Sequence, residues 1–356
     1  MSEQKFEAIL QPLSLRGLTL PYRAALSSMC QYSADQGFPT SWHFRHYAER
    51  AVGGASLVML EATAILPEGR ISPDDLGIWD AEHAQALARL VEQLHSLGVA
   101  VGVQLAHAGR KASVAAPWKS GKTVHPDQGG WVVRAPSAIP FTEGDPMPSP
   151  LSSDEISEVL EAFVAAAQRA HQAGFDVIEL HAAHGYLVHQ FLSPLTNQRQ
   201  DSWGGDFDGR TRLAVEASRA LRTVWPAEKP LFARISATDW AEGGWTPADT
   251  VKLARLWKKE GVDLVDVSSG GLVPGAKIPL GPGYQVPFAA QVRSEAQIPT
   301  AAVGLLQDWQ QINEVISSEQ ADLVLLGRQL LRDPYWLLRH LPASLQKVPP
   351  QYLRAF

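Results

Sequence analysis

Segment 181–186 has the sequence HAAHGY and brings three chemically active side chains close together in the chain. His181 and His184 are three residues apart, and two imidazole donors aimed at one substrate oxygen stabilise negative charge that develops on it. Tyr186 follows, and a phenol with a pKa of about 10 stays protonated at neutral pH and can deliver a proton. The alternatives are a metal site built on both histidines, a buried structural pair, and a tyrosine that serves packing alone.

A second set of residues has the chemistry of an anion site. Gly304 and Gly327 each follow a short apolar run, and Arg328 comes directly after the second of them. Glycines allow backbone N–H groups to approach a phosphate closely, and a guanidinium group binds phosphate oxygens with two N–H donors. The alternative is that both glycines only make tight turns.

Arg234 lies within an apolar run, where an ionised guanidinium needs an acceptor. Either an internal partner such as Glu179 or the electron-rich N1/O2 edge of a flavin would satisfy it.

Apolar runs of strand length recur along the chain, and segments of helix length follow them. The predicted strands are residues 24–29, 56–64, 99–106, 176–181, 230–236, 264–268, 300–303 and 323–326. The predicted helices include residues 81–97, 154–173, 211–224, 247–260, 288–296 and 309–318. Nearly continuous apolar strands are typical of a parallel sheet covered on both faces. Eight such units without a break in composition predict an α/β fold, a closed (β/α)₈ TIM barrel, in one domain spanning residues 1–356.

Helix boundaries are also marked in the sequence. Ser153 or Asp154 is a candidate N-cap, and Gly174 is placed to end the same helix. Thr246 followed by Pro247 predicts another helix start.

Two segments depart from this rhythm. Residues 109–150, after the third strand, are rich in Gly, Pro, Ser and Trp, and we expect an inserted lid over the barrel mouth with a short hairpin. Residues 343–356 lie beyond the last helix and form a C-terminal arm. Because catalytic groups of such barrels gather at the carboxyl ends of the strands, the active residues are expected at the mouth below the lid.

The composition excludes several classes of protein. The 356-residue chain has 45% hydrophobic residues and a net charge of −6, with Lys and Arg scattered, so we expect no nucleic-acid partner. No signal peptide layout or membrane-length apolar stretch is present, and we expect a cytoplasmic protein without a membrane partner. Cys30 is the single cysteine, which excludes an internal disulfide and a Cys-ligated cluster.

In these motifs the chain resembles the Old Yellow Enzyme family of FMN-dependent ene-reductases, and within it the bacterial subgroup whose first strand ends in a cysteine. The similarity runs nearly end to end, with its motifs in order. The matching stretches are MCQY at 29–32, EAT at 61–63, QLAHAGRK at 104–111, HAAHGYL at 181–187, QRQDSWGG at 198–205 and LGR at 326–328.

The resemblance implies one FMN lying across the strand ends. Ala62 and Gln104 would contact the isoalloxazine ring, with Gln104 bonding its pyrimidine edge. Arg234 would support its N1/O2 edge, and Cys30 would adjust its redox potential. The residues implied for cofactor binding are Ser28, Met29, Cys30, Ala62, Gln104, Arg234, Gly304, Gly327 and Arg328. No metal is implied.

The resemblance also implies the reaction of an NADPH dehydrogenase. NADPH or NADH reduces the flavin, and flavin N5 passes hydride to the β-carbon of an activated alkene, an α,β-unsaturated carbonyl or nitro compound. His181 and His184 would bind the substrate oxygen, Tyr186 would protonate the α-carbon, and Tyr32 would line the pocket. Protein groups supply position and electrostatics around the cofactor.

The C-terminal arm resembles a tail that reaches a neighbouring subunit's active site in related enzymes. The resemblance therefore places Tyr352 and Arg354 at a partner's substrate pocket and implies a homodimer or homotetramer. A frayed terminus is the alternative.

Two departures from the family concern substrate choice. Ser28 stands where relatives often have proline, and Val303 where some close relatives have tryptophan. Two other functions stay open. One is a metal-dependent barrel hydrolase that uses His181 and His184, and the other is a flavin-based redox sensor that uses Cys30.

Overall fold

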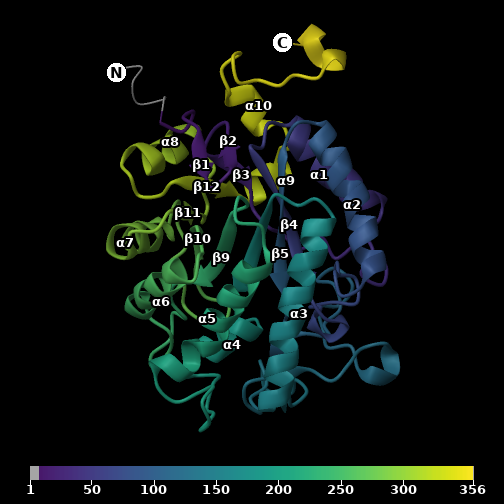
Figure 1. Cartoon of the computed structure of the whole chain (residues 1–356), viewed down its shortest axis with the longest axis vertical. Helices are drawn as coiled ribbons and strands as arrows, with labels where there is room; N and C mark the ends of the chain where they lie inside the picture. Colours follow the sequence, from purple (N-terminus) through teal and green to yellow (C-terminus); the bar gives the residue numbers. More distant parts are fainter. Residues whose placement is uncertain (1–7, 356) are drawn as a thin grey trace.

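The computed structural model describes residues 8–355, and at its centre eight parallel strands close into a barrel (Figure 1). Neighbouring strands follow the order of the chain around the ring, and the last pairs with the first. The strands are β3 (Ala24–Leu26), β4 (Leu57–Ala64), β5 (Ala100–Ala106), β8 (Val177–Ala182), β9 (Leu231–Ser236), β10 (Leu264–Ser268), β11 (Thr300–Ala302) and β12 (Leu323–Leu326). All their residues except Ala100 are buried, as expected for apolar runs covered on both faces. The (β/α)₈ barrel predicted from the sequence is confirmed.

Helices form the outer layer around the strands. They are α1 (Ser41–Val52), α2 (Ala81–Ser96), α3 (Ser153–Gln172), α4 (Leu187–Leu192), α5 (Phe207–Val224), α6 (Pro247–Lys259), α7 (Val286–Ala296), α8 (Trp309–Ser317), α9 (Arg328–Arg332) and α10 (Trp336–His340). The cap predicted for α3 is shifted by one residue or more, since Ser152 accepts from the N–H of Glu155 and forms a capping box with it. Thr246 and Pro247 start α6 as predicted.

The interior of the barrel is built in layers. Its lower layer is apolar and includes Leu57, Val177 and Phe232, together with Leu13 and Leu15 from the N-terminal hairpin. That hairpin, β1 (Leu13–Leu15) paired with β2 (Leu18–Leu20), therefore closes the barrel at the amino ends of its strands. The open end is the one where the strands finish, and polar side chains lie there.

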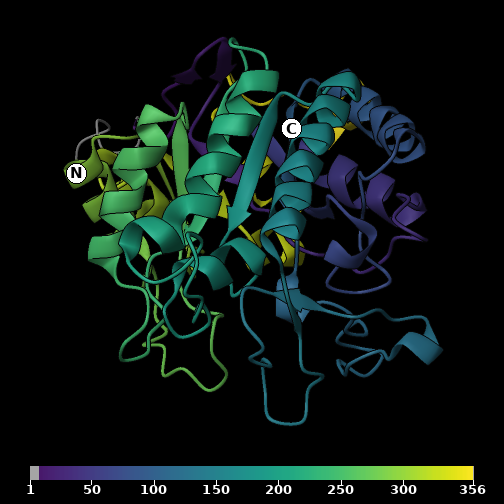
Figure 2. The same cartoon turned by 60° about the horizontal axis from the view of Figure 1, so that its bottom comes forward.

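Segment 109–150 leaves the barrel between β5 and α3 and extends beyond the strand ends (Figure 2). It contains the short turns η3 (Gly109–Lys111) and η4 (Pro126–Gln128). β6 (Arg134–Ala135) and β7 (Ser149–Pro150) pair parallel to each other, while an antiparallel bridge joins Val114 to Thr123. A lid role for this segment stays a prediction.

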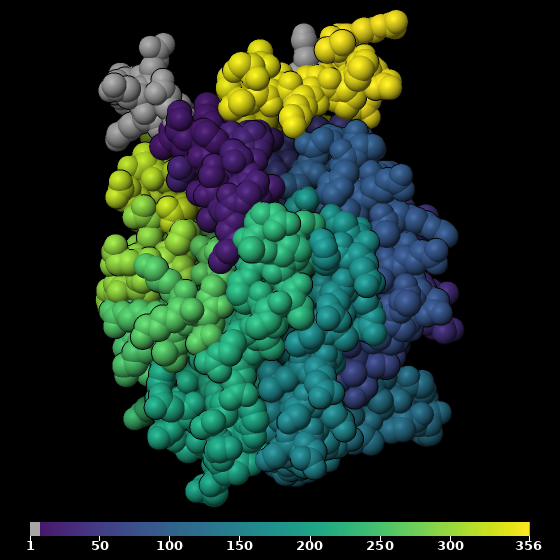
Figure 3. All heavy atoms as spheres, in the orientation of Figure 1, coloured from purple at the N-terminus to yellow at the C-terminus, as the bar shows by residue number. Residues whose placement is uncertain are grey.

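The C-terminal arm lies at the other end of the molecule. In Figures 1 and 3 the last residues, which include η5 (Pro350–Ala355), project at the top, whereas segment 109–150 lies at the bottom. Among residues 8–355 no helix combines the length and the apolar character that crossing a bilayer requires.

Candidate active site

Four polar side chains form a layer inside the barrel, directly above the apolar one. Gln104, Glu179, Arg234 and Asp266 come from four consecutive strands, β5, β8, β9 and β10, and are at most 7% exposed. The register places Gln104 opposite Glu179 and Arg234 opposite Asp266. Since interior side chains alternate along a strand, His181 and Ser268 belong to the next level towards the mouth.

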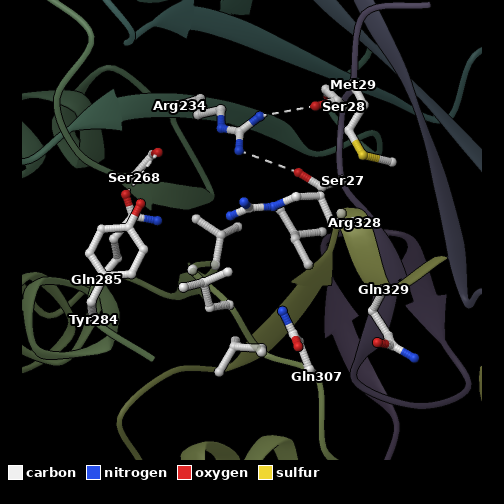
Figure 4. Close-up of a pocket in the computed structure, with 16 residues that line it drawn as sticks. Ser27, Ser28, Met29, Arg234, Ser268, Tyr284, Gln285, Gln307, Arg328 and Gln329 are labelled. Carbon is white, nitrogen blue, oxygen red and sulfur yellow. Dashed lines mark hydrogen bonds between the residues drawn. The ribbon is translucent and has the colours of Figure 1, made fainter. Parts of the chain in front are cut away.

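The internal partner of Arg234 differs from the one suggested by the sequence. Its Nε lies 2.8 Å from a carboxylate oxygen of Asp266, so Asp266 and not Glu179 forms the ion pair. The two terminal nitrogens point towards the loop after β3, where they donate to the Ser28 carbonyl and the Ser27 hydroxyl at 3.3 Å each (Figure 4).

The turn between β8 and α4 brings His181, His184 and Tyr186 together. Ring centroids of His181 and His184 are 5.3 Å apart, and those of His181 and Tyr186 are 5.0 Å apart, both edge to face. The backbone is left-handed at His184 (φ +58°) and at Gly185 (φ +74°). His189 fixes this turn because its Nδ1 accepts the Gly185 N–H at 2.9 Å, while its Nε2 lies 2.8 Å from the buried carboxylate of Asp239.

Both histidines of the turn are neutral imidazoles in this environment. Burial lowers the pKa of His181 and of His184 well below the ordinary value, and the nearby charge of Arg234 lowers both further. A neutral ring carries one N–H donor and one acceptor nitrogen. His181 Nδ1 accepts from the Ala183 N–H at 3.3 Å, which leaves its Nε2 as the donor.

Sequence reasoning gave no role to the residues that hold His184. Its Nε2 lies 2.8 Å from Ser268 Oγ, and Gln285 Oε1 accepts from Ser268 Oγ at 3.3 Å and from Ser269 Oγ at 2.7 Å. Gln285 lies just before α7, in a stretch without a motif, so only the fold reveals its contact. The single Ser268 hydroxyl proton serves either Gln285 Oε1 or His184 Nε2, and when it is donated to Nε2 the His184 proton lies on Nδ1 and is available to a ligand.

Tyr186 is half-buried beside a lysine. Desolvation raises the pKa of Tyr186 well above the usual value near 10, so its hydroxyl stays protonated. Lys111 Nζ lies 5.1 Å from the centre of the Tyr186 ring and donates to the carbonyls of His184 and Gly271 at 2.9 Å each. Lys111 therefore joins two loops of the barrel mouth. From the sequence, no role was predicted for this residue.

The loop after β3 carries Cys30 and Tyr32. Glu61 anchors it by accepting the N–H of Gln31. Burial and the carboxylates of Asp75 and Glu61 raise the pKa of the Cys30 thiol well above its usual value. The residue is therefore a thiol and not a thiolate, although the Tyr32 hydroxyl hydrogen-bonds to it.

A cavity of about 200 Å³ lies between the loops that follow β3, β10, β11 and β12 (Figure 4). Ser28, Met29, Arg234, Gly304, Gly327 and Arg328 are among its lining residues. Arg328 points into it, and Gly304 has φ +113°, where a Cβ atom would lie 3.0 Å from Gln285 Nε2. Two guanidinium groups and two close-approach glycines fit the flavin phosphate and pyrimidine edge that the sequence implies.

A larger cavity of about 720 Å³ lies under segment 109–150. Tyr32 and Tyr186 line it together with Lys111 and other residues of that segment. A small hollow beside it connects Ala62 with Tyr186. Tyr32 and Tyr186, two of the site residues predicted from the sequence, thus face one space, beside the histidine pair.

Two predicted site residues lie elsewhere. The exposed segment η5, which carries Tyr352 and Arg354, is at the end of the molecule opposite segment 109–150 (Figure 3), so the chain does not bring them to its own pocket. Within residues 8–355, no group of three His, Cys, Asp or Glu side chains has the arrangement of metal ligands.

Comparison with known proteins places the chain among flavin oxidoreductases. A family model described as NADH:flavin oxidoreductase / NADH oxidase family matches residues 8–343. An NADPH dehydrogenase of Geobacillus thermodenitrificans (strain NG80-2) is 49% identical over 330 residues, 92% of either chain. An NADPH dehydrogenase of Listeria monocytogenes serotype 4a (strain HCC23) is 46% identical over 347 residues, 96% of this chain and 97% of the relative.

Solved structures agree with these relatives. Morphinone reductase superposes with a TM-score of 0.78 at 27% identity, covering 96% of this chain and 92% of its own. The old yellow enzyme homologue from Zymomonas mobilis superposes with a TM-score of 0.79 at 22% identity, covering 96% and 97%, which supports the fold.

Proposed function

The chain belongs to the NADH:flavin oxidoreductase / NADH oxidase family, the family of the Old Yellow Enzymes, and from that premise we propose that it is an ene-reductase. It is an FMN-dependent NAD(P)H oxidoreductase. The proposal concerns the electron acceptor, an alkene activated by a carbonyl or nitro group. It also concerns the residues that bind and protonate this substrate.

The observation that carries the proposal is the convergence of His181, His184 and Tyr186 on one side of the barrel mouth. Two neutral imidazoles, each with one N–H donor, suit an uncharged carbonyl or nitro oxygen that gains negative charge during reaction. Withdrawal of electron density towards that oxygen makes the β-carbon electron-poor.

Tyr186 is suited to the second half of the reaction. Its raised pKa keeps the hydroxyl proton in place at any pH near neutrality, and the cavity under segment 109–150 reaches its side chain. A phenol that stays protonated can deliver its proton to the carbanion-like α-carbon as the alkene becomes saturated.

Bound FMN supplies the hydride after its reduction by NADPH or NADH. Arg234, Gly304, Gly327 and Arg328 would hold the cofactor in the cavity of Figure 4. Ser28 and Met29 line the same cavity, whereas Cys30, Ala62 and Gln104 would contact the ring system. Each of these roles is part of the proposal.

The two alternative functions receive less support. A redox sensor needs a reactive thiolate, and the raised pKa of Cys30 disfavours one. A metal-dependent hydrolase needs further ligands beside His181 and His184, and the described residues offer no such set.

We further propose that Tyr352 and Arg354 act in the site of a second copy of the chain, in a homodimer or homotetramer. The exposed η5 segment, distant from its own pocket, supports this. The cytoplasmic location expected from the sequence stays a prediction.

Tyr186→Phe tests the proposed function. Loss of a general acid lowers the rate of the protonation step by about 10²–10⁴-fold. We therefore expect NADPH to bleach the flavin absorbance as fast as in the wild type, while cyclohexenone reoxidises it much more slowly. Stopped-flow absorbance separates the two half-reactions. Reoxidation by cyclohexenone at the wild-type rate would falsify the acid role of Tyr186.

A further inference from the structure

The polar layer inside the barrel contains more acid than base. Gln104, Glu179, Arg234 and Asp266 are 2%, 0%, 7% and 1% exposed, and they supply one guanidinium and two carboxyl groups. If both acids were ionised the layer would hold one uncompensated negative charge away from water, which is strongly unfavourable.

Glu179 is the carboxyl group without an ionic partner. Arg234 Nε pairs with Asp266 at 2.8 Å, whereas Glu179 Oε1 accepts only the Gln104 side-chain N–H at 2.7 Å. Glu179 Oε2 is buried and has no hydrogen-bond partner among the described residues. Desolvation and the neighbouring Asp266 raise the pKa of Glu179 to about 8, against smaller opposing effects of Arg234, Gln104 and Ser28.

Contacts on both sides connect Glu179 to the cofactor site. Gln104 uses its amide N–H₂ group on Glu179, so its carbonyl oxygen is left for another partner. Arg234 extends from the same layer into the cavity of Figure 4. These two residues are the ones proposed to meet the pyrimidine edge of the flavin.

We propose that Glu179 is a positioning residue for the flavin: it holds the Gln104 amide, and by exchanging one proton it sets the net charge of the layer that faces the reduced cofactor. With Glu179 protonated, Arg234 and Asp266 cancel and the layer is neutral. With Glu179 ionised, the layer carries one negative charge and opposes an anionic reduced flavin.

The charge balance gives the sign of the pH effect. Transfer of a hydride, with two electrons and one proton, leaves the flavin one unit more negative. An ionised Glu179 then takes up one proton from solvent, which restores the charge of the site. Asp266 stays paired to Arg234, and the lowered pKa of His181 keeps that ring neutral, so the extra proton belongs to Glu179.

The midpoint potential of bound flavin measures this uptake. For a two-electron couple a tenfold change in proton concentration corresponds to about 30 mV per proton taken up. We expect the wild-type potential to fall by about 30 mV per pH unit below pH 7.5, and by about 59 mV per pH unit from about pH 8 upwards. If the wild type by itself shows a constant slope of about 30 mV per pH unit up to pH 10, the proton-exchange role of Glu179 is overturned.

Glu179→Gln is the matched variant because its carbonyl still accepts from Gln104 but cannot titrate. We expect the slope of about 30 mV per pH unit throughout and an FMN dissociation constant within about threefold of the wild type. If the slope of about 59 mV per pH unit above pH 8 persists in Glu179→Gln, the proton is taken up by another group.

Glu179→Leu removes the hydrogen bond as well. Loss of one hydrogen bond of about 1 kcal/mol predicts an FMN dissociation constant roughly five- to tenfold higher, measured by quenching of flavin fluorescence. Wild-type affinity in this variant would contradict the role in holding Gln104.

The inference rests on the proposed placement of FMN beside Gln104 and Arg234, and Gln104→Leu tests that placement separately. Unchanged FMN affinity in Gln104→Leu would reject the placement itself. Alkene reduction enters none of these measurements, so failure of the ene-reductase proposal leaves their outcome intact.

Discussion

At the residue scale, burial acts alike on histidines that serve different purposes. His46 in α1 and His107 after β5 have their pKa lowered to about 3 and about 4 by desolvation, in the same direction as His181 and His184. His46 stacks on Trp42 and lies edge to face against Tyr47, and its Nε2 has no hydrogen-bond partner among residues 8–355. Among residues 8–355, only His181 has both a second histidine, His184, and a tyrosine, Tyr186, as ring neighbours. Geometry, and not the pKa shift, therefore separates a candidate site from a core histidine.

The shift at His46 predicts an effect on stability. Its folded pKa of about 3 lies below the unfolded value near 6.5. Between these values the unfolded chain binds a proton at His46 that the folded chain does not, so the free energy of unfolding is highest above pH 6.5 and decreases as the pH falls. Each pH unit costs about 1.4 kcal/mol, or about 2 kcal/mol between pH 6.5 and pH 5. Between pH 7 and pH 5, the free energy of unfolding of His46→Phe should rise by about 2 kcal/mol relative to that of the wild type, as measured by urea unfolding. His125→Phe, at an exposed position, is the control. An equal gain in both variants would contradict the assignment to His46.

At the scale of elements, the active turn depends on two loops that touch through their backbones. A Cβ atom on Gly185 would overlap the carbonyl oxygen of Gly271 and lie 2.8 Å from the Cα of Leu272. Lys111 joins the same two loops by its bonds to the carbonyls of His184 and Gly271. The glycine between His184 and Tyr186 is therefore required both by its positive φ and by this contact.

Gly185→Ala and Gly205→Ala separate the two requirements. Both glycines have φ near +75°, but nothing lies within 4 Å of a Cβ atom on Gly205. We expect Gly205→Ala to lose about 1–2 kcal/mol of unfolding free energy through left-handed strain alone. Gly185→Ala should lose a further 1–3 kcal/mol or so through the overlap, together with most alkene reduction. Thermal unfolding and steady-state rates measure both effects. Equal losses in the two variants would show that the contact between the loops is unimportant.

The sequence predicted those helices and strands well whose buried side chains are aliphatic. Every barrel strand was found within three residues of its ends, because apolar runs covered on both faces leave a continuous pattern. Helix α1 was not predicted, since its buried face consists of His43, His46, Tyr47, Arg50 and Ala51. Such a polar and aromatic face gives no apolar period.

Contacts across strands were harder to predict than the strands themselves. The partner of Arg234 depends on the register of β9 against β10, which puts Asp266 opposite it. No local pattern distinguishes that carboxylate from Glu179. In the same way, Ser268 meets His184, and Gln285 meets Ser268, only because the loops after β8 and β10 converge at the barrel mouth.

At the scale of the whole molecule, the candidate site and the C-terminal arm lie at opposite ends of the barrel. In Figure 1 the N-terminal hairpin closes the barrel at the top, where the arm with η5 also projects, and the barrel opens into the site towards segment 109–150 at the bottom. Leu353 in the arm is 61% exposed and Tyr352 43% exposed. An exposed arm of this kind contributes little to the folding of its own barrel, so its contribution is expected between chains.

Removal of residues 350–356 tests this expectation. The truncated chain should keep its FMN content and its melting temperature, because residues 350–355 are exposed, while its KM for cyclohexenone rises. Mixed oligomers give a sharper test. A truncated chain supplies an intact Tyr186, and a full-length Tyr186→Phe chain supplies an intact arm. If the arm acts in a neighbouring site, oligomers reassembled from both should reduce cyclohexenone faster than either variant alone. Activity equal to the mean of the two separate variants would place the arm outside the partner's pocket.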